Sequence, residues 1–449
     1  MQNDVKQRIG AWVDENREAL IEELKGFLRI PGLTGHEGEV QKFMQAQYER
    51  LGLAVDVFEP DVRELFEKYP EVAQFPTSWE PELDLVIPTS DICTYEQWLE
   101  SGYADRLNYK GRPNVVGTWK GVGGGRSLIL NGHADSVAVG DLKSWEHDPF
   151  GAEQVDDRIY ARGAGDMKGG LLACAKALEA LQAVGVRLRG DVICQSAVNE
   201  EHSGNGTLAC VARGYTADAA ICADGGFSLK TQSGGGVYWR IRVLGREIHT
   251  GGRWRGGKMN GVSAIEKAAR IINALCDAEQ QANADGIRLS LGVGTIQGGT
   301  YATSTAKECT VSGVAYFTPA MGLGEAGIRA VKDLLRDAID RIADADEWLS
   351  ENKPELSFLH YDDAYVYPDG HELLPLMLAT GEAMLGKTLS VVSMSACDAR
   401  HLGNQGHIPC IVCGPGGGGS HAPNEFISID SYLDYIKFLA LTVYHWCSL

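Results

Sequence analysis

The sequence predicts an α/β protein with a smaller α+β domain inserted into it. Three short apolar runs have the length and composition of buried strands: residues 127–130, 192–196 and 219–223. A strong helical pattern over residues 171–184 separates the first two runs, as expected for strands joined by helices. From about Thr231 the pattern changes to longer strands of alternating polarity, and the earlier apolar character returns from Gly370.

The other elements follow from local periodicity and from Gly and Pro stops. Two N-terminal helices, a strand at 114–119 and a Pro- and Glu-rich insertion at 59–110 complete the first part of the chain. The inserted part has strands of alternating polarity and two amphipathic helices, and the last part ends in a helix at 429–445. We therefore expect three segments: 1–229 and 366–449, which form one catalytic domain, and the inserted domain 230–365.

Composition limits the function classes that fit the chain. The 449 residues are 44% hydrophobic and 22% charged, with a net charge of −19. This excess of negative charge disfavours nucleic acid and anionic membranes as partners. No apolar stretch is long enough for a membrane helix, and the N-terminus does not resemble a secretory signal. The 11 cysteines are scattered singly, mostly in apolar runs. We expect a cytoplasmic protein that acts on a small molecule.

Ionisable residues follow each of the predicted strands at its carboxyl end. His133 and Asp135 follow the first strand, Glu200 and Glu201 the second, and Asp224 the third. In open α/β sheets this edge is where ligands and catalytic groups collect. Each signal alone has a plain structural explanation, such as a buried His–Asp pair or solvated acids. Together they favour a metal site, because adjacent buried carboxylates need a compensating cation.

Two further residues complete the predicted ligand set. Asp166 lies in a glycine-bordered loop before the helix at 171–184, where a helix-capping acid is the structural alternative. His421 follows the glycine run 416–419 near the C-terminus. Two histidines and three carboxylates suit two divalent ions that share a carboxylate. Glu200, next to a ligand, suits a general base.

The motifs around these residues resemble one family throughout nearly the whole chain. The matching segments are 131–137, 160–170, 199–201, 223–225 and 419–425. In their order and spacing they are similar to the two-zinc amidohydrolases and exopeptidases that include acetylornithine deacetylase, succinyl-diaminopimelate desuccinylase, aminoacylase and carboxypeptidase G. The resemblance implies a zinc-exopeptidase-like catalytic domain with a mixed central sheet, and an inserted lid and dimerisation domain.

The resemblance also assigns a role to each residue of the site. His133 and Asp224 bind one metal ion, Glu201 and His421 bind the other, and Asp166 bridges the two. Asp135 orients His133, and Glu200 takes a proton from a bridging water and passes it to the leaving amine. The metal ions are expected to be Zn2+, with Co2+ or Mn2+ as alternatives.

Two residues outside the metal set are expected to contact the substrate. By the resemblance, His249 of the inserted domain reaches the active site of the partner subunit in a homodimer and polarises the scissile carbonyl. Arg400 clamps a substrate carboxylate, for which a guanidinium is well suited. A solvated loop histidine is the structural alternative for His249, and a structural arginine is the alternative for Arg400.

The implied activity is hydrolysis of the amide C–N bond of an N-acyl amino acid or small peptide. The segment 301–317 departs from the family, because it lacks the family's asparagine, proline and arginine near the substrate pocket. This departure favours an alternative in which the same metal chemistry cleaves a non-peptide C–N bond, as in a deformylase, a carbamoylase or an aryl-amine aminohydrolase. A binding protein without catalysis on the same fold is a third alternative. The long insertion at 59–110 is expected to wall the pocket.

Overall fold

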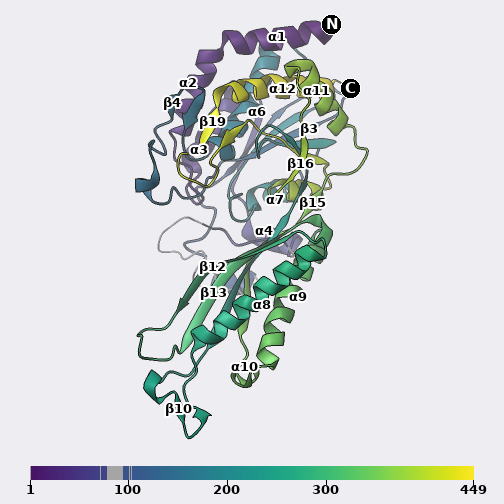
Figure 1. Cartoon of the computed structure of the whole chain (residues 1–449). Coiled ribbons are helices and arrows are strands. Elements are labelled where there is room, and N and C mark those ends of the chain that lie inside the picture. The colour runs from purple at the N-terminus through teal and green to yellow at the C-terminus, as the bar shows by residue number, and fades with distance from the viewer. Residues whose placement is uncertain (1, 71, 78–94, 101, 103, 449) are drawn as a thin grey trace. The chain divides into compact units, whose positions relative to one another are not determined.

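The computed structural model describes residues 2–70, 72–77, 95–100, 102 and 104–448, which divide into two compact units. Unit 1 comprises the described residues up to 232 and residues 366–448, and unit 2 comprises residues 233–365. The elements of both units are labelled in Figure 1. None of the helices in the described part of the chain is long and apolar enough to cross a bilayer.

Unit 1 is built on a nine-stranded mixed sheet of order β1-β2-β6-β3-β7-β17-β8-β15, with β16 paired to β8. The strands are β1 (Ala54–Phe58), β2 (Asn114–Trp119), β3 (Leu128–His133), β6 (Val192–Ala197), β7 (Ala219–Cys222), β8 (Leu229–Ser233), β15 (Tyr365–Val366), β16 (Val391–Met394) and β17 (Cys410–Val412). The central strands β6, β3, β7 and β17 run parallel. Every residue of β3, β6 and β7 is buried, as is usual for parallel strands covered on both faces. The predicted α/β class with a mixed sheet is confirmed.

Helices and a small second sheet surround this core. The helices of unit 1 are α1 (Gln2–Glu15), α2 (Arg17–Leu28), α3 (Gly38–Arg50), α4 (Val62–Lys68), α5 (Tyr95–Glu100), α6 (Gly169–Ala183), α7 (Asn205–Ala212), α11 (Leu373–Leu385) and α12 (Ile429–Cys447). The second sheet has the order β18-β19-β5-β4, with β4 (Glu153–Val155), β5 (Arg158–Tyr160), β18 (Gly417–Gly418) and β19 (Phe426–Ser428). Helix α6 packs against α12, and almost all of its residues are buried.

Two details of unit 1 differ from the sequence-based expectation or extend it. The strand expected at 127–130 continues to His133, because His133 still pairs with Ala197 of β6. His133 is therefore the last residue of a strand and not part of the loop beyond it. The insertion contains helices α4 and α5, and its residues 78–94 lie outside the described residues.

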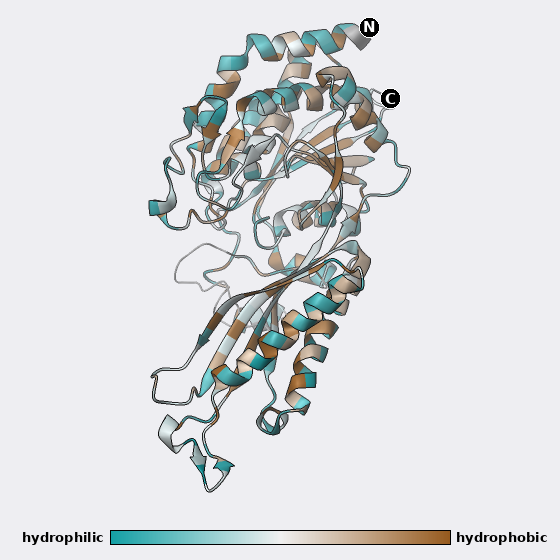
Figure 2. Ribbon diagram, viewed as in Figure 1, coloured by the Kyte–Doolittle hydropathy of each residue, from teal (hydrophilic) through white to brown (hydrophobic). Residues whose placement is uncertain are grey.

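Unit 2 is a four-stranded antiparallel sheet with helices packed on it. The sheet order is β12-β13-β9-β14, with β9 (Gly235–Leu244), β12 (Leu289–Gly298), β13 (Glu308–Phe317) and β14 (Glu355–Asp362). Its helices are α8 (Ala264–Ala284), α9 (Glu325–Asp344) and α10 (Glu347–Glu351), and β10 (Trp254–Arg255) pairs with β11 (Lys258–Met259). Apolar and polar residues alternate along α8 and α9 (Figure 2), whose buried faces join the strands in one core around Trp239, Leu275 and Leu335.

Candidate metal centre and active site

Parallel strand pairing brings the predicted ligands to one edge of the sheet. His133 ends β3 opposite Ala197, the last residue of β6, and Glu200 and Glu201 follow that strand. Strand β7 lies on the other side of β3, and Asp224 follows two residues after its end. Since the carboxyl ends of parallel strands meet at the same edge, residues up to 91 positions apart in the chain converge there by register alone.

The loop that carries Asp166 is held by main-chain hydrogen bonds. The carboxylate of Glu425, which is 1% exposed, accepts from the amides of Asp166 and Gly165, both at 3.0 Å. It also accepts from Arg162 at 2.7 Å. The peptide bond after Asp166 is cis. At Gly170 a Cβ atom would lie 1.8 Å from the carbonyl oxygen of Ala223, so this glycine allows helix α6 to start directly beside the segment that carries Asp224.

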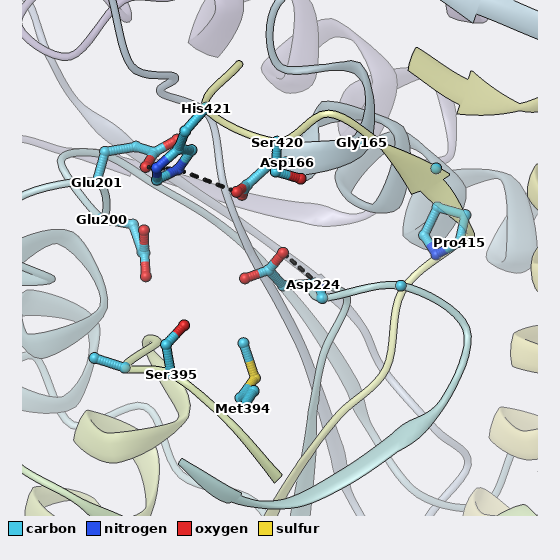
Figure 3. Close-up of a pocket in the computed structure, with 14 residues that line it drawn as sticks. Gly165, Asp166, Glu200, Glu201, Asp224, Met394, Ser395, Pro415, Ser420 and His421 are labelled. Carbon is cyan, nitrogen blue, oxygen red and sulfur yellow. Dashed lines mark hydrogen bonds and ion pairs between the residues drawn. The ribbon is translucent and has the colours of Figure 1, made fainter. Parts of the chain in front are cut away.

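The Nε2 atoms of the two histidines lie 2.9–3.6 Å from carboxylate oxygens of the group. His133 Nε2 lies 3.3 Å from Asp166 Oδ1 and 3.6 Å from Glu200 Oε2. His421 Nε2 lies 3.2 Å from Asp166 Oδ2 and 2.9 Å from Glu201 Oε2. Asp166 thus lies between the two histidines, and Figure 3 shows Asp224 on the same side of the pocket, pointing toward Asp166. The group that could hold a metal ion by mutual distance is His133, Asp166 and Glu201.

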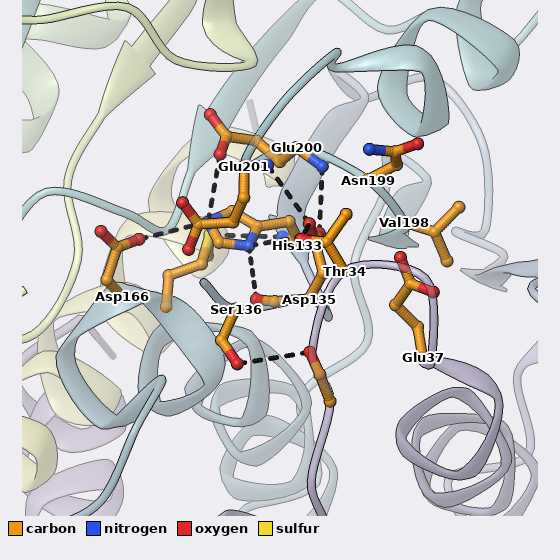
Figure 4. Close-up of polar contacts among 12 residues, drawn as sticks. Thr34, Glu37, His133, Asp135, Ser136, Asp166, Val198, Asn199, Glu200 and Glu201 are labelled. Carbon is orange, nitrogen blue, oxygen red and sulfur yellow. Dashed lines mark hydrogen bonds and ion pairs between the residues drawn. The ribbon is translucent and has the colours of Figure 1, made fainter. Parts of the chain in front are cut away.

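Asp135 supports this group mainly by accepting hydrogen bonds from main-chain amides. Its carboxylate accepts from the amides of Glu200 at 3.0 Å and Glu201 at 3.2 Å, and from the Thr34 hydroxyl at 2.8 Å (Figure 4). The His133 Nδ1 atom is 3.0 Å from the Asp135 carbonyl oxygen and 3.6 Å from its carboxylate. With its Nδ1 proton donated to that carbonyl, a neutral His133 keeps the lone pair of Nε2 available for a metal ion.

The electrostatics of the group show an excess of buried negative charge. Burial raises the pKa of Glu201 to about 7 and that of Asp224 to about 6, and the neighbouring Asp166 adds to both shifts. Burial, with Asp398, Glu201 and Asp224 nearby, also raises the pKa of Glu200 well above its usual range, although His133 opposes the shift. Hydrogen bonds to Asp166 and Glu201 raise the pKa of His421 to about 11. The group therefore competes for protons, which a bound cation would replace.

The donor set fits divalent metal ions. His133 Nε2 and Glu201 Oε1 are fully buried and make no hydrogen bond within the described part of the chain. Buried polar atoms normally have a partner, so two such atoms in one carboxylate-rich pocket are best explained as ligand atoms. Imidazole nitrogen and carboxylate oxygen are the donors that zinc and similar borderline ions prefer.

The cavity beside this group has two chemically different walls. Its volume is about 370 Å³, the size of a site for a small molecule. One wall carries Asp166, Glu200, Glu201, Asp224 and His421, and Met394 and Ser395 lie across from it (Figure 3). Ala396 and Pro415 also line the cavity. Of the described residues, none of the fourteen that line the cavity is a lysine or an arginine. The insertion at 59–110 was expected to wall the pocket, and none of its described residues is among those that line the cavity.

Each of the two predicted substrate contacts has polar contacts within its own unit. Arg400 is 2% exposed, and its guanidinium donates to the carbonyl oxygens of Cys397 and Ser203, both at 3.3 Å. His249 belongs to unit 2, where its side chain is exposed and its Nδ1 accepts from the Gly251 amide at 3.1 Å. Neither observation tests the role assigned to these residues.

Several residues around the site have roles that the sequence analysis did not assign. Glu425 holds the Asp166 loop, Thr34 contacts Asp135, and Met394 and Ser395 form the neutral wall. Glu425 lies in the same motif as His421, and that proximity is the signal that could have identified it. Thr34 gives no such signal, because its partner is 101 residues away in an irregular segment.

Comparison with known proteins identifies the family. Residues 129–445 match the model of Peptidase family M20/M25/M40. The chain belongs to this family. The predicted resemblance is thereby confirmed, and with it the prediction of a metal-dependent hydrolase that acts on C–N bonds.

Individual relatives match this chain over most of its length. The chain is 33% identical over 387 residues to the N-formyl-4-amino-5-aminomethyl-2-methylpyrimidine deformylase of Bacillus subtilis (strain 168), covering 79% of this chain and 89% of the relative. The protein of the same name from Halalkalibacterium halodurans is 33% identical over 367 residues, with 76% and 84% covered. A dipeptidase structure from Saccharomyces cerevisiae superposes with a TM-score of 0.72 at 14% identity, covering 100% of both chains, and supports the fold alone.

Proposed function

We propose that the protein hydrolyses the amide bond of a small N-acyl amine that lacks a carboxylate, with an N-formylated aminomethyl heterocycle as the leading candidate. The observation that carries this proposal is the lining of the cavity. The described lining residues include no lysine or arginine, so none of them offers an ammonium or guanidinium group to a substrate carboxylate. The guanidinium of Arg400 is engaged with main-chain carbonyls instead. Two deformylases that match more than three quarters of the chain support the same substrate class.

The positions of the site residues support a separate role for each of them in the proposed reaction. We propose that His133 and Asp224 hold one divalent cation, Glu201 and His421 hold a second, and Asp166 bridges them. Two such ions, Zn2+ with Co2+ or Mn2+ as alternatives, would polarise the scissile carbonyl and lower the pKa of water. Glu200 then accepts a proton from the attacking water and gives it to the leaving amine. Its contact with His133 at 3.6 Å keeps its carboxylate next to the ligands.

His249 is proposed to complete the site from the partner subunit of a homodimer. Because its Nδ1 accepts from the Gly251 amide, the ring carries its proton on Nε2, where it can donate to a carbonyl oxygen. Strand β12 supports the dimer, since it is the edge strand of its sheet and exposes Ile296 and most of residues 292–298. The cytoplasmic location expected from composition stays a prediction.

The test of the substrate class is amine release from matched pairs of compounds by the zinc-loaded protein. The panel pairs N-formyl-4-amino-5-aminomethyl-2-methylpyrimidine and N-formyl benzylamine with N-formyl and N-acetyl amino acids. We expect hydrolysis of the first two and little of the amino acids. Hydrolysis confined to the amino acids would overturn the proposal and restore the N-acyl amino acid or small peptide as substrate, with Arg400 as the clamp.

The dimeric site has its own test. Glu200→Ala and His249→Ala proteins are each expected to be nearly inactive. If His249 acts across subunits, mixing the two after partial unfolding and refolding restores activity, because each heterodimer contains one site with both residues intact. Absence of recovery in a mixture shown to contain heterodimers would contradict the role of His249.

A further inference from the structure

The described part of the insertion packs against the segment that carries Glu200. Asn199, which directly precedes Glu200, is completely buried. Its Oδ1 accepts from the Tyr109 hydroxyl at 2.9 Å and from the Thr77 amide at 3.2 Å, and its Nδ2 donates to the Thr77 hydroxyl at 2.6 Å. Both Tyr109 and Thr77 belong to the insertion, so both ends of the Asn199 amide are held by it. We call Thr77, Tyr109 and Asn199 the Asn199 clamp.

The insertion side of the Asn199 clamp is itself fixed. Asn205 donates to the Tyr109 hydroxyl at 2.9 Å and to the carbonyl oxygen of Gln74 at 2.6 Å. Arg112 donates to the Thr77 carbonyl at 3.2 Å. Burial raises the pKa of Tyr109, so its hydroxyl remains a hydrogen-bond donor throughout the neutral range. A rigid, fully bonded support of this kind can set the position of the residue it holds.

Arg112 continues this support to the N-terminal helices. Its guanidinium pairs with Glu37 through two hydrogen bonds of 2.7 Å, and both side chains are buried. Glu37 directly precedes α3, and Figure 4 shows it on the side of the group opposite Asp166. The insertion is therefore fastened to the body of unit 1 close to where it reaches Asn199.

The main chain transmits the position of Asn199 to Glu200. Asn199 has a φ of 64°, in the left-handed region that non-glycine residues rarely adopt, and its carbonyl accepts from the amides of Ser203 at 3.1 Å and Gly204 at 2.9 Å. The next amide, that of Glu200, donates to Asp135 at 3.0 Å. The segment is thus fixed by the insertion at one residue and by Asp135, next to a metal ligand, at the following one.

We propose that Thr77 and Tyr109 are positioning residues for the hydrolytic reaction, through which the insertion places the carboxylate of Glu200. This inference rests on the role of Glu200 in the proposed function. It gives the insertion a part in the reaction other than walling the pocket. The position of the Glu200 carboxylate relative to the reacting atoms then depends on residues that lie 90 and 122 positions from Asn199 in the sequence.

The experiment removes the clamp hydroxyls one at a time from the zinc-loaded full chain. With the panel compound that is hydrolysed, Tyr109→Phe and Thr77→Val are each expected to lower kcat by about 10- to 100-fold, since displacement of a catalytic group by about 1 Å has effects of this size. KM and bound zinc are expected to stay unchanged. Thr77→Ser retains the hydroxyl and is expected to retain kcat. Tyr69→Phe removes a hydroxyl of the same insertion that makes none of the Asn199 contacts and serves as the control.

A second background separates positioning from general damage. In Glu200→Asp the carboxylate is already displaced, so Tyr109→Phe is expected to cost clearly less there than in the wild type. An equal loss in both backgrounds, a loss of zinc, or an unchanged kcat would overturn the inference and make the clamp purely structural. Those results leave the proposed function intact provided that Glu200→Ala is inactive. An active Glu200→Ala protein would instead remove the base role of Glu200, and the inference with it.

Discussion

Two buried charge clusters, one in each unit, differ in how their charges are balanced. In unit 2, the carboxylate of Asp346 pairs with Lys267 at 2.6 Å and Arg270 at 2.8 Å. Its other oxygen accepts from the amides of Trp348 and Leu349 at the start of α10. The cluster of unit 1 gathers four carboxylates, Asp166, Glu200, Glu201 and Asp224, around His133 and His421, and two of its buried atoms have no hydrogen-bond partner among the described residues.

The pKa of Asp346 in unit 2 is shifted in the opposite direction to the pKa values of Glu201 and Asp224 in unit 1. Burial opposes ionisation of Asp346, but Lys267 and the helix amides lower its pKa below the usual value. Burial raises the pKa values of Glu201 and Asp224, and the charge of Asp166 adds to the effect. We call the cluster around Asp346 balanced and the cluster of unit 1 unbalanced. The balanced cluster stabilises the folded state without any bound ion, whereas the unbalanced cluster lowers the stability of the folded state until a cation binds. This difference separates a structural ion pair from a functional site.

The largest expected effect comes from removing Glu200, the proposed general base, from the unbalanced cluster. Glu200→Ala should lower kcat by about 10²- to 10⁴-fold, because a positioned general base contributes that much. The variant should still bind two metal ions, since Glu200 is not among the proposed ligands; metal analysis beside steady-state kinetics checks both points. Glu18→Ala, on the exposed face of α2, is the control. Substantial turnover by Glu200→Ala would remove its assignment as the base.

In the balanced cluster, the same kind of substitution should damage stability and not chemistry. Asp346→Ala leaves the buried ammonium of Lys267 without its partner, which should cost about 3–5 kcal/mol in the free energy of unfolding. Denaturant unfolding measures the loss, and kcat with bound metal should be retained under folded conditions. Exposed Glu347→Ala, next in sequence, should stay within about 0.5 kcal/mol of wild type. A similarly small loss for Asp346→Ala would show that the pairing contributes little.

Sequence predicted most of the unbalanced cluster, because its geometry follows from strand register. His133, Glu200 and Asp224 end or follow neighbouring parallel strands, and local apolar runs are enough to locate those strands. The Asn199 clamp and the support of Asp135 by Thr34 were not predicted. They join irregular segments 90 to 122 residues apart, where no periodicity indicates which residues meet. The burial of Arg400 against the Ser203 carbonyl is of the same kind.

The next expected effect is a difference in pH dependence of stability between the two clusters, measured after chelation of metal. Asp224 has a pKa of about 6 against an ordinary 3.8, and Glu201 about 7 against 4.5. A carboxyl with a raised pKa contributes stability below its ordinary pKa and loses it as pH rises through the raised one. Metal-free protein should therefore lose about 1–3 kcal/mol between about pH 4 and 7. Asp346, whose pKa is lowered, contributes in the opposite sense and loses its contribution only as pH falls toward 3.8 and below.

Two comparisons check the assignment of this pH effect. In metal-free Asp224→Asn the loss above about pH 4 should be smaller, because the amide cannot ionise. Wild-type protein with zinc should not show the loss, since the cation compensates the carboxylates and stabilises the folded state by binding it. An equally steep loss in metal-free Asp224→Asn and wild type would place the titrating groups elsewhere.

The smallest expected effect lies at the exposed edge of the balanced cluster. The Arg270 side chain is 64% exposed and shares one Asp346 oxygen with Lys267. Arg270→Ala should therefore cost at most about 1 kcal/mol, because water screens its charge and Lys267 keeps the carboxylate paired. The loss should shrink further in high salt, whereas that of Asp346→Ala should persist because its charges are buried. The loss of stability in Arg270→Ala could instead be independent of salt and as large as that in Asp346→Ala. The Asp346 carboxylate would then need both Lys267 and Arg270 as partners. That result would contradict the contrast drawn between a buried charge with a partner and one without.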